Sequence, residues 1–377
     1  MKIAVVIPKY GLVGGAETFA FEVCERLALR REFEIHVFAN KWRSEQGAVT
    51  FHKVPIIRFP RYLDPMSFAY FADKLIRRQD FDLIHSHERI FEMDIFTFHG
   101  IPHSIWKKRI REKPLTLFDR ATAWVEEKGF CNPKLKMVMP VSSLVQEELL
   151  QKYDFLENKI FINPPGVALE RFSALDPQKC RQEILLRYNW SQKDIIVLFV
   201  SMNFELKRLD LVLKGMAAAA DGENKISSLK LLVVGKGNQK RFKKLACDMG
   251  ISDRVIFVGV TREVEKYYMA ADIFAMPSGF DTFGLVVLEA MAAGLPVIIS
   301  KNVGARDLVK QGENGFVLSA NPSIFEIATS LTLLIDPEKR RLMGESGRQV
   351  ACLHSWDKTA DRMANLYQRI GNGVEYS

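Results

Sequence analysis

Two carboxylates that flank the start of an expected helix are the residues of this sequence best suited to chemistry. Asp281 follows a turn at 277–279, and Glu289 lies further on, about two turns inside a helix expected over 284–293. Unpaired backbone N–H groups at a helix start bind phosphate, and flanking carboxylates accept hydrogen bonds from sugar hydroxyls. The amides expected at this helix start are those of Phe283, Gly284 and Leu285.

The two carboxylates alone fit equally well an N-capping Asp and a solvated Glu in mid-helix. The whole string from 276 to 296 favours a ligand site, because it resembles the acid-x7-acid signature of the family-4 retaining glycosyltransferases, which have the GT-B fold. In that family the first acid contacts the donor sugar and the second holds the nucleotide ribose. The resemblance implies these roles for Asp281 and Glu289, with Asp281 one methylene shorter than the usual Glu.

A basic pair follows the strand expected at 195–200. A Lys beyond the carboxyl end of a strand can stabilise a diphosphate that gains charge as a glycosidic bond breaks. In the family's Gly-Arg-x-x-x-x-Lys-Gly pattern, Lys207 matches the Lys, Met202 stands at the Arg and Arg208 at the last Gly. The resemblance implies that Lys207 is catalytic and that Arg208 supplies the missing charge, although an ordinary exposed basic pair is the alternative.

Two positions in the N-terminal half join this set through the resemblance. Gly15 belongs to a glycine loop between the first strand and helix, which faces the donor diphosphate in the family. Without the resemblance, a plain turn before a helix is the favoured interpretation. His99 follows the strand expected at 95–98 and matches a His that contacts the donor sugar; a lone His is more often structural. His87 is a lesser candidate.

Two loops are expected near the nucleotide. Gly235 begins a Gly-x-Gly loop after one strand, and Val260 follows the next strand, where backbone contacts the base in the family. The seven histidines and their spacing form no metal-ligand triad in the sequence, so we expect no metal and no cofactor. The glycines at 11, 14 and 15 do not have the spacing of a dinucleotide fingerprint, which argues against a nicotinamide dehydrogenase.

Length and composition indicate two domains of a globular protein. The chain has 377 residues, 48% of them hydrophobic and 26% charged, and no apolar run long enough to span a bilayer. The first residues read as a strand rather than a leader. Five scattered cysteines without a Cys-x-x-Cys pair argue against disulfides and zinc, so we expect a cytoplasmic protein.

Apolar strand-like runs alternate with helical patterns, restarting after a break near 163–166. This predicts parallel sheets covered on both faces. We expect an α/β protein of the GT-B type: two Rossmann-like domains, 1–168 and 169–355, with parallel sheets facing a central cleft. The resemblance also implies that 356–377 packs back on the N-terminal domain. The strands expected first are 3–7, 35–38, 83–85, 95–98 and 138–140, and after the break 195–200, 231–234, 255–258, 273–276 and 297–299.

A basic segment in the first half points to an anionic surface. Residues 101–137 hold nine basic and four acidic residues, mixed with bulky apolar ones, whereas the net charge of the whole chain is +8. A solvated basic helix with its apolar side on the core is the alternative. A similar stretch in lipopolysaccharide-core glucosyltransferases of the family implies a membrane-bound acceptor. The residues expected to meet the acceptor or membrane are Trp106, Lys107, Lys108, Arg109 and Arg111.

The leading hypothesis is a metal-independent retaining transferase that moves a hexose, most simply glucose from UDP-glucose, to a lipid-linked glycan. The acceptor implied is a lipopolysaccharide-core heptose, and the place implied is the inner leaflet of the cytoplasmic membrane. A GT-B mannosyl- or N-acetylglucosaminyltransferase is the alternative enzyme. A basic nucleic-acid-binding protein is the alternative from another class, but no recognised nucleic-acid motif is present.

Overall fold

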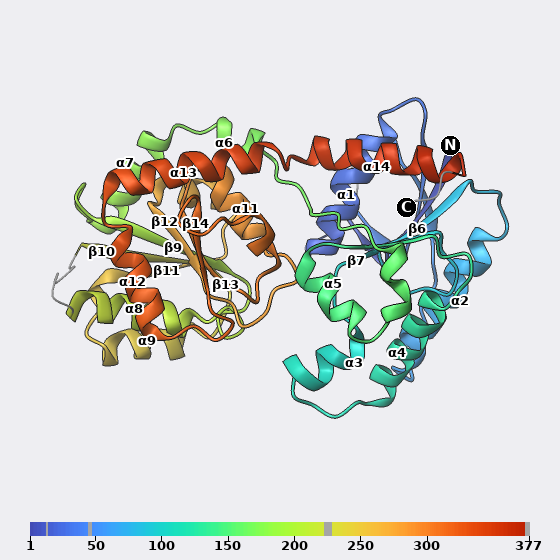
Figure 1. Cartoon of the computed structure of the whole chain (residues 1–377), viewed down its shortest axis with the longest axis horizontal. Helices are drawn as coiled ribbons and strands as arrows, with labels where there is room; N and C mark the ends of the chain where they lie inside the picture. The colour runs from blue at the N-terminus through green and yellow to red at the C-terminus, as the bar shows by residue number, and fades with distance from the viewer. Residues whose placement is uncertain (13, 44–46, 222–227, 374–377) are drawn as a thin grey trace. The chain divides into compact units, whose positions relative to one another are not determined.

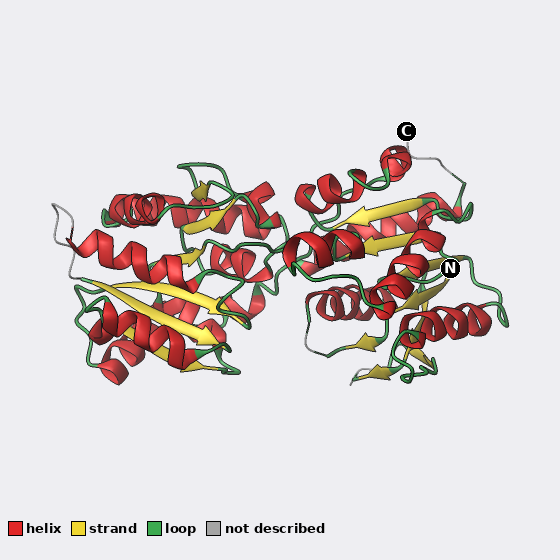
Figure 2. Ribbon diagram, turned by 90° about the horizontal axis from the view of Figure 1, so that it is seen from below, coloured by secondary structure: helices red, strands yellow, loops and turns green. Residues whose placement is uncertain are grey.

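The chain forms two compact units. A computed structural model describes its residues 1–12, 14–43, 47–221 and 228–373. The first comprises Met1–Gly166 and Trp356–Ser377, and the second comprises Val167–Ser355. Each unit holds a six-stranded sheet whose described pairings are all parallel. Helices pack on both faces of each sheet (Figure 2), as the uninterrupted apolar strand sequences predict.

The first sheet has the strand order β5-β3-β1-β6-β7-β8. The order changes direction between β1 and β6, and in open parallel sheets this switch point is where ligands bind, beyond the carboxyl ends of the strands. The strands are β1 (Lys2–Val6), β3 (Glu34–Ala39), β5 (Thr50–Lys53), β6 (Leu83–Ser86), β7 (Ile95–Phe98) and β8 (Met137–Pro140); a separate parallel pair joins β2 (Lys9–Tyr10) to β4 (Lys41–Trp42).

The helices of this unit follow the expected alternation with strands. They are α1 (Gly15–Ala28), α2 (Leu63–Ile76), α3 (His103–Ile105), a π-helix (Trp106–Ile110), α4 (Leu117–Phe130), α5 (Ser143–Leu150), a 3₁₀ turn (Asp154–Lys159) and α14 (Trp356–Gly371).

Helix α14 belongs to the first unit although it ends the chain. It lies along α1 (Figure 1), with the Arg26 guanidinium 2.7 Å from the Asp357 carboxylate and the Trp356 ring against Phe19. Tyr367 reaches the sheet, where its hydroxyl lies 2.5 Å from Nδ1 of the buried His85. Eight buried side chains on one face of α14 explain why it packs on this unit.

The second sheet repeats the topology with the order β11-β10-β9-β12-β13-β14, so its switch point lies between β9 and β12. Its strands are β9 (Ile195–Ser201), β10 (Leu229–Gly235), β11 (Val255–Gly259), β12 (Ile273–Met276), β13 (Val297–Ser300) and β14 (Gly315–Leu318). Its helices are α6 (Glu170–Ser173), α7 (Pro177–Tyr188), α8 (Leu209–Asp221), α9 (Gln239–Asp248), α10 (Val264–Ala270), α11 (Leu285–Ala292), α12 (Ile324–Leu333) and α13 (Pro337–Cys352), with 3₁₀ turns at Ser252–Arg254 and Gly304–Leu308.

Candidate functional site

The loops that follow β9 and β12 meet at the switch point of the second sheet. Lys207, from the first loop, places its ammonium 2.5 Å from Oδ2 of Asp281 and 3.0 Å from the carbonyl oxygen of Phe280, both in the second loop. The Lys207 and Asp281 side chains are 16% and 20% exposed, so this ion pair is largely removed from water. The structure therefore brings together two predicted site residues that are distant in the sequence.

Backbone hydrogen bonds hold Asp281 from both sides. Its own N–H donates to the carbonyl oxygen of Asn302 at 2.8 Å, and its carbonyl oxygen accepts from the N–H of Gly304 at 3.0 Å. Just before it, the N–H of Gly279 donates to the carbonyl oxygen of Leu206 at 2.8 Å, which links this loop to the one that carries Lys207. The carboxylate is thus presented from a fixed backbone, as a positioned ligand contact requires.

The start of α11 supplies part of the predicted phosphate site. Gly284 adopts a φ of 89°, and a Cβ added there would lie 3.0 Å from Cγ1 of Val303, so glycine suits both the turn and the packing. The amide of Phe283 already donates to Oδ1 of Asp281 at 3.3 Å. The amides of Gly284 and Leu285 belong to the end of the helix, where N–H groups have no partner inside the helix.

Glu289 is held by a residue that the sequence did not single out. The hydroxyl of Tyr268, in α10, donates to Oε2 of Glu289 at 2.8 Å, and the Tyr268 side chain is fully buried. Burial raises the pKa of the half-buried Glu289 carboxyl, and the hydrogen bond from Tyr268 opposes that shift. Nothing in the sequence marks Tyr268, since its pairing with Glu289 depends on how α10 packs beside α11.

Arg208 faces a different partner from the one expected. Its guanidinium lies 3.1 Å and 3.4 Å from the carboxylate oxygens of Asp210 in the first turn of α8, so its charge is engaged by a residue two positions further along the chain. Its backbone φ of 59° lies in the left-handed region that favours glycine. This explains in physical terms why a Gly is common at this place in the pattern that the sequence resembles.

Two further predicted positions lie at the same carboxyl edge of the second sheet. Gly235 ends β10 with a φ of 114°, and a Cβ there would lie 1.8 Å from the carbonyl oxygen of Ser201. Gly235 is therefore required by the close approach of β10 to the end of β9. Val260 follows β11 and is 67% exposed, so it is accessible to a ligand.

Gly15 and His99 lie in the first unit, and their contribution to donor binding stays a prediction. Gly15 is exposed at the first position of α1. His99 follows β7, with Nε2 at 3.0 Å from Nδ1 of His87 and the Phe19 ring against it. Burial lowers the pKa of His99 to about 3, so its imidazole is neutral at neutral pH.

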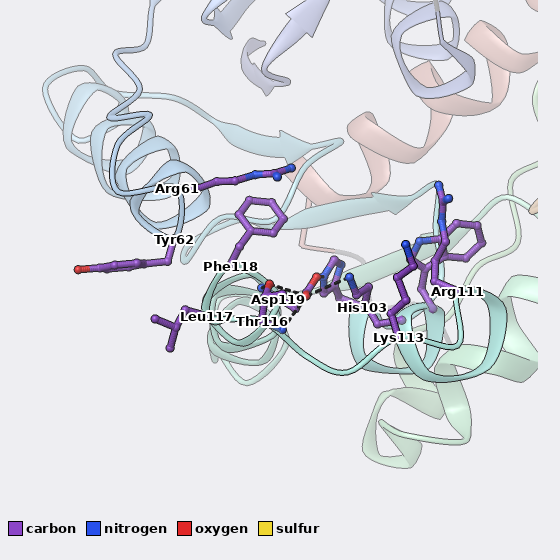
Figure 3. A pocket seen from close by; sticks show the side chains of 11 residues that line it. Arg61, Tyr62, His103, Arg111, Lys113, Thr116, Leu117, Phe118 and Asp119 are labelled. Carbon is purple, nitrogen blue, oxygen red and sulfur yellow. Dashed lines mark hydrogen bonds and ion pairs between the residues drawn. The ribbon is translucent and has the colours of Figure 1, made fainter.

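The basic segment is less outward-facing than predicted. Its π-helix turns the Lys107 ammonium to the buried Asp119 carboxylate, 3.1 Å away, and Trp106 is half-buried beneath the Arg111 guanidinium. Lys108 is exposed, as expected, while the side chain of Arg109 lies outside the described part. The segment lines a pocket (Figure 3) rather than forming a uniform basic helix.

The described part of the structure contains neither a cluster of metal ligands nor a membrane-spanning helix. The described side chains include no group of three or more His, Cys, Asp or Glu arranged to hold a metal ion. Across the same ranges, every helix is too short or too polar to cross a bilayer.

Comparison with known protein families places both halves of the chain. Residues 13–171 match the model of "Glycosyltransferase Family 4", and residues 181–350 match that of "Glycosyl transferases group 1". Among curated proteins, the putative glycosyltransferase EpsD of Bacillus subtilis is 26% identical over 354 residues, which are 89% of each chain. A Mycobacterium tuberculosis GDP-mannose-dependent phosphatidylinositol monomannoside mannosyltransferase is 33% identical over 215 residues, 54% of each chain.

Solved structures share the fold over nearly the whole length. WaaG, a glycosyltransferase involved in lipopolysaccharide biosynthesis, aligns with a TM-score of 0.79 at 20% identity, covering 97% of this chain and 99% of that one. Anabaena HepE in complex with UDP-glucose aligns with a TM-score of 0.75 at 18% identity, covering 98% and 99%. With two Rossmann-like units and family matches on both halves, the chain belongs to the GT-B glycosyltransferases of the family 4 and group 1 type.

Proposed function

We propose that this glycosyltransferase moves a hexose with retention of configuration from a UDP-sugar, most simply UDP-glucose, to a glycolipid. The Lys207–Asp281 ion pair at the switch point of the second sheet carries this proposal. A cation and an anion held side by side at the carboxyl edge of a parallel sheet suit a ligand that has both a diphosphate and sugar hydroxyls.

The proposed donor contacts use residues at the carboxyl edge of the second sheet. Lys207 reaches the diphosphate, Asp281 accepts hydrogen bonds from the sugar, and Glu289 accepts from the ribose. The amides of Gly284 and Leu285 add donors for phosphate oxygens. Val260 and Gly235 line the edge where the base and ribose lie, and Arg208, Gly15 and His99 complete the set that the family resemblance implies.

The chemical step that we propose needs no enzymatic nucleophile. The bond between the sugar C1 and the phosphate oxygen breaks while the acceptor oxygen bonds to C1 from the same face. The acceptor proton passes to an oxygen of the departing UDP. The Lys207 ammonium offsets the charge that grows on that diphosphate, which is the role that a divalent cation has in metal-dependent transferases.

The acceptor side of the proposal rests on the basic segment of the first unit. In this proposal the segment contacts a phosphorylated glycolipid, such as a lipopolysaccharide-core heptose, at the inner leaflet of the cytoplasmic membrane. The contacting residues are Trp106, Lys107, Lys108, Arg109 and Arg111. Each exposed cation adds on the order of 1 kcal/mol at an anionic surface. Co-sedimentation with anionic vesicles should therefore fall as salt rises, and should be lost when these four basic residues are changed to Ser.

A GDP-mannose-dependent mannosyltransferase is the second candidate. It is favoured by the 33% identity to the mycobacterial mannosyltransferase. Both candidates use the same second-unit contacts, so the base and the sugar must be determined by experiment.

The deciding experiment measures nucleoside diphosphate release from a panel of UDP- and GDP-sugars, with a lipid extract as acceptor. The proposal is supported if the parent protein releases UDP from UDP-glucose and Lys207→Ala does not. GDP release from GDP-mannose supports the mannosyl alternative. Release from no donor, or full activity of Lys207→Ala, would contradict the site assignment.

A further inference from the structure

A separate cavity lies within the first unit, between the start of α2 and the start of α4. It has a volume of about 590 Å³, within the usual range of small-molecule sites. Its walls come from the residues before α2, the π-helix and the loop that leads into α4. None of the donor contacts proposed above lines it.

The cavity is strongly basic. Four cationic side chains line it, against one acid, Asp119; the cations are Arg61, Lys107, Arg111 and Lys113. Lys107 pairs with Asp119 at 3.1 Å, but within the described ranges no carboxylate forms an ion pair with Arg61, Arg111 or Lys113. Cations that line one cavity without acidic partners repel each other, so an anion bound there is stabilised.

Aromatic rings hold two of these cations in place. The Arg111 guanidinium lies 5.5 Å from the centre of the Trp106 ring, and the Arg61 guanidinium 4.9 Å from that of Phe118. Figure 3 shows Arg61 on one side of Asp119, with Arg111 and Lys113 on the other. Stacked guanidinium groups are already ordered before a ligand arrives, so less entropy is lost when they bind it.

The wall that carries Arg111 and Lys113 is fixed at both ends. The π-helix places the N–H of Arg111 on the carbonyl oxygen of Trp106 at 3.0 Å, and that of Lys113 on the carbonyl oxygen of Lys107 at 3.1 Å. The loop ends at a capping box in which Thr116 and Asp119 bind each other. π-Helical turns are rare in proteins overall, and those that occur are often found at functional sites.

Asp119 organises the wall without cancelling its charge. Its carboxylate accepts from the Thr116 hydroxyl at 2.6 Å and from Nε2 of His103 at 2.9 Å, in addition to Lys107. These contacts hold the Asp119 pKa below its usual range against the opposing effect of burial, so the residue stays ionised. The Asp119 charge is therefore paired with Lys107 in the wall of the cavity, and the other three cations remain available to a ligand.

We infer that this cavity binds a phosphate monoester or diphosphate group, and that it is where the acceptor's phosphate is recognised. A carboxylate carries one charge, whereas a phosphate monoester carries about −1.5 to −2 near neutral pH and suits several cations at once. An arginine guanidinium can donate two parallel hydrogen bonds to two oxygens of one phosphate. The acceptor assignment rests on the proposed function; the binding of phosphate rests on the cavity alone.

The test is calorimetric titration of the full chain with inorganic pyrophosphate, with saturating UDP present to fill the donor site. Arg111→Ala and Lys113→Ala should each weaken binding by roughly tenfold, the loss of one charge-assisted contact. Lys128→Ala is the matched control, because Lys128 is an exposed cation of α4 that lies outside the cavity and has no proposed binding role. Both test residues are exposed, so their removal leaves the core intact.

Vesicles separate the two sources of the phosphate. If it belongs to a lipid, the protein prefers phosphatidic acid to phosphatidylglycerol vesicles, and pyrophosphate releases it. If it belongs to a soluble sugar phosphate, pyrophosphate binds but both vesicles behave alike. No pyrophosphate binding, or equal losses in Lys128→Ala and the two test variants, would overturn the inference. UDP release from the donor panel reports on the second unit, so failure here leaves the donor assignment standing.

Discussion

The buried hydroxyl of Tyr268 donates a 2.8 Å hydrogen bond to Oε2 of Glu289. This bond fixes the orientation of a carboxylate that burial would otherwise favour in its neutral form. With Oε2 engaged, we expect Oε1 to be the oxygen that meets a ribose hydroxyl. Tyr268 is thus a positioning residue for the second acid of the signature.

Tyr268→Phe removes this hydrogen bond together with the longer contact, 3.3 Å, between the same hydroxyl and the carbonyl oxygen of Val286. A hydrogen bond to a charged group contributes about 1.5 kcal/mol or more, so UDP affinity should fall by roughly tenfold. Tyr267→Phe is the control, because the Tyr267 hydroxyl lies 3.3 Å from Arg187, away from Glu289. Calorimetric titration with UDP measures both variants; equal affinity of Tyr268→Phe and the parent would contradict the positioning role.

The raised pKa of Glu289 makes donor binding sensitive to acid. The ionised carboxylate accepts from ribose hydroxyls, so UDP affinity should fall as pH drops through that pKa. In Tyr268→Phe the opposing hydrogen bond is gone, and the loss should begin at higher pH. Glu289→Gln should bind weakly with no such pH step. A parent whose UDP affinity is flat across the acid range would argue against ribose recognition by Glu289.

The loss of Lys207 should damage turnover more than the loss of Arg208. Lys207→Ala and Glu289→Gln should each lower turnover by at least about a hundredfold, because each removes a charged donor contact. Arg208→Ala should cost only about tenfold, since its guanidinium is already engaged by Asp210. Asp281→Glu should retain activity and change the sugar preference. Steady-state rates across the donor panel test this order, and a larger loss for Arg208 than for Lys207 would reverse the two roles.

Asp73, buried in α2, gives the first unit a pH-dependent stability. Burial raises its pKa to about 7, and the nearby Glu92 charge adds to the shift. The folded state thus binds a proton that the unfolded state releases near pH 4, so stability falls as pH rises from about 4 to about 7. The full shift corresponds to roughly 4 kcal/mol. Urea unfolding across this range should show the slope, and Asp73→Asn should remove it.

Two glycine substitutions separate packing from backbone strain. In Gly235→Ala the new methyl would overlap the carbonyl oxygen of Ser201, so the free energy of unfolding should fall by about 3 kcal/mol or more. Gly250→Ala meets no atom within 4 Å and bears only the strain of a φ of 65°, which costs about 1–2 kcal/mol. Urea unfolding compares them; equal losses would mean that the Gly235 contact relaxes cheaply.

Much of the fold could be predicted from the sequence. The strands at 95–98 and 273–276 were predicted to the residue, because apolar runs bounded by polar or turn residues define buried parallel strands. The separate short pair β2 and β4 was not predicted, and in the two six-stranded sheets β5 and β14 were missed. Strands β5 and β14 lie at a sheet edge, where burial on two faces is incomplete and the apolar run is short.

The sequence by itself determined the class of protein and the residue types of the donor site, because the acid-x7-acid string and the Lys207 loop are local patterns. Tertiary structure alone decided the pairings. Asp281 pairs with Lys207, and Glu289 accepts a hydrogen bond from Tyr268. These partners come from loops and helices that meet only when the strands are ordered into a sheet, and sequence spacing carries no information about that order.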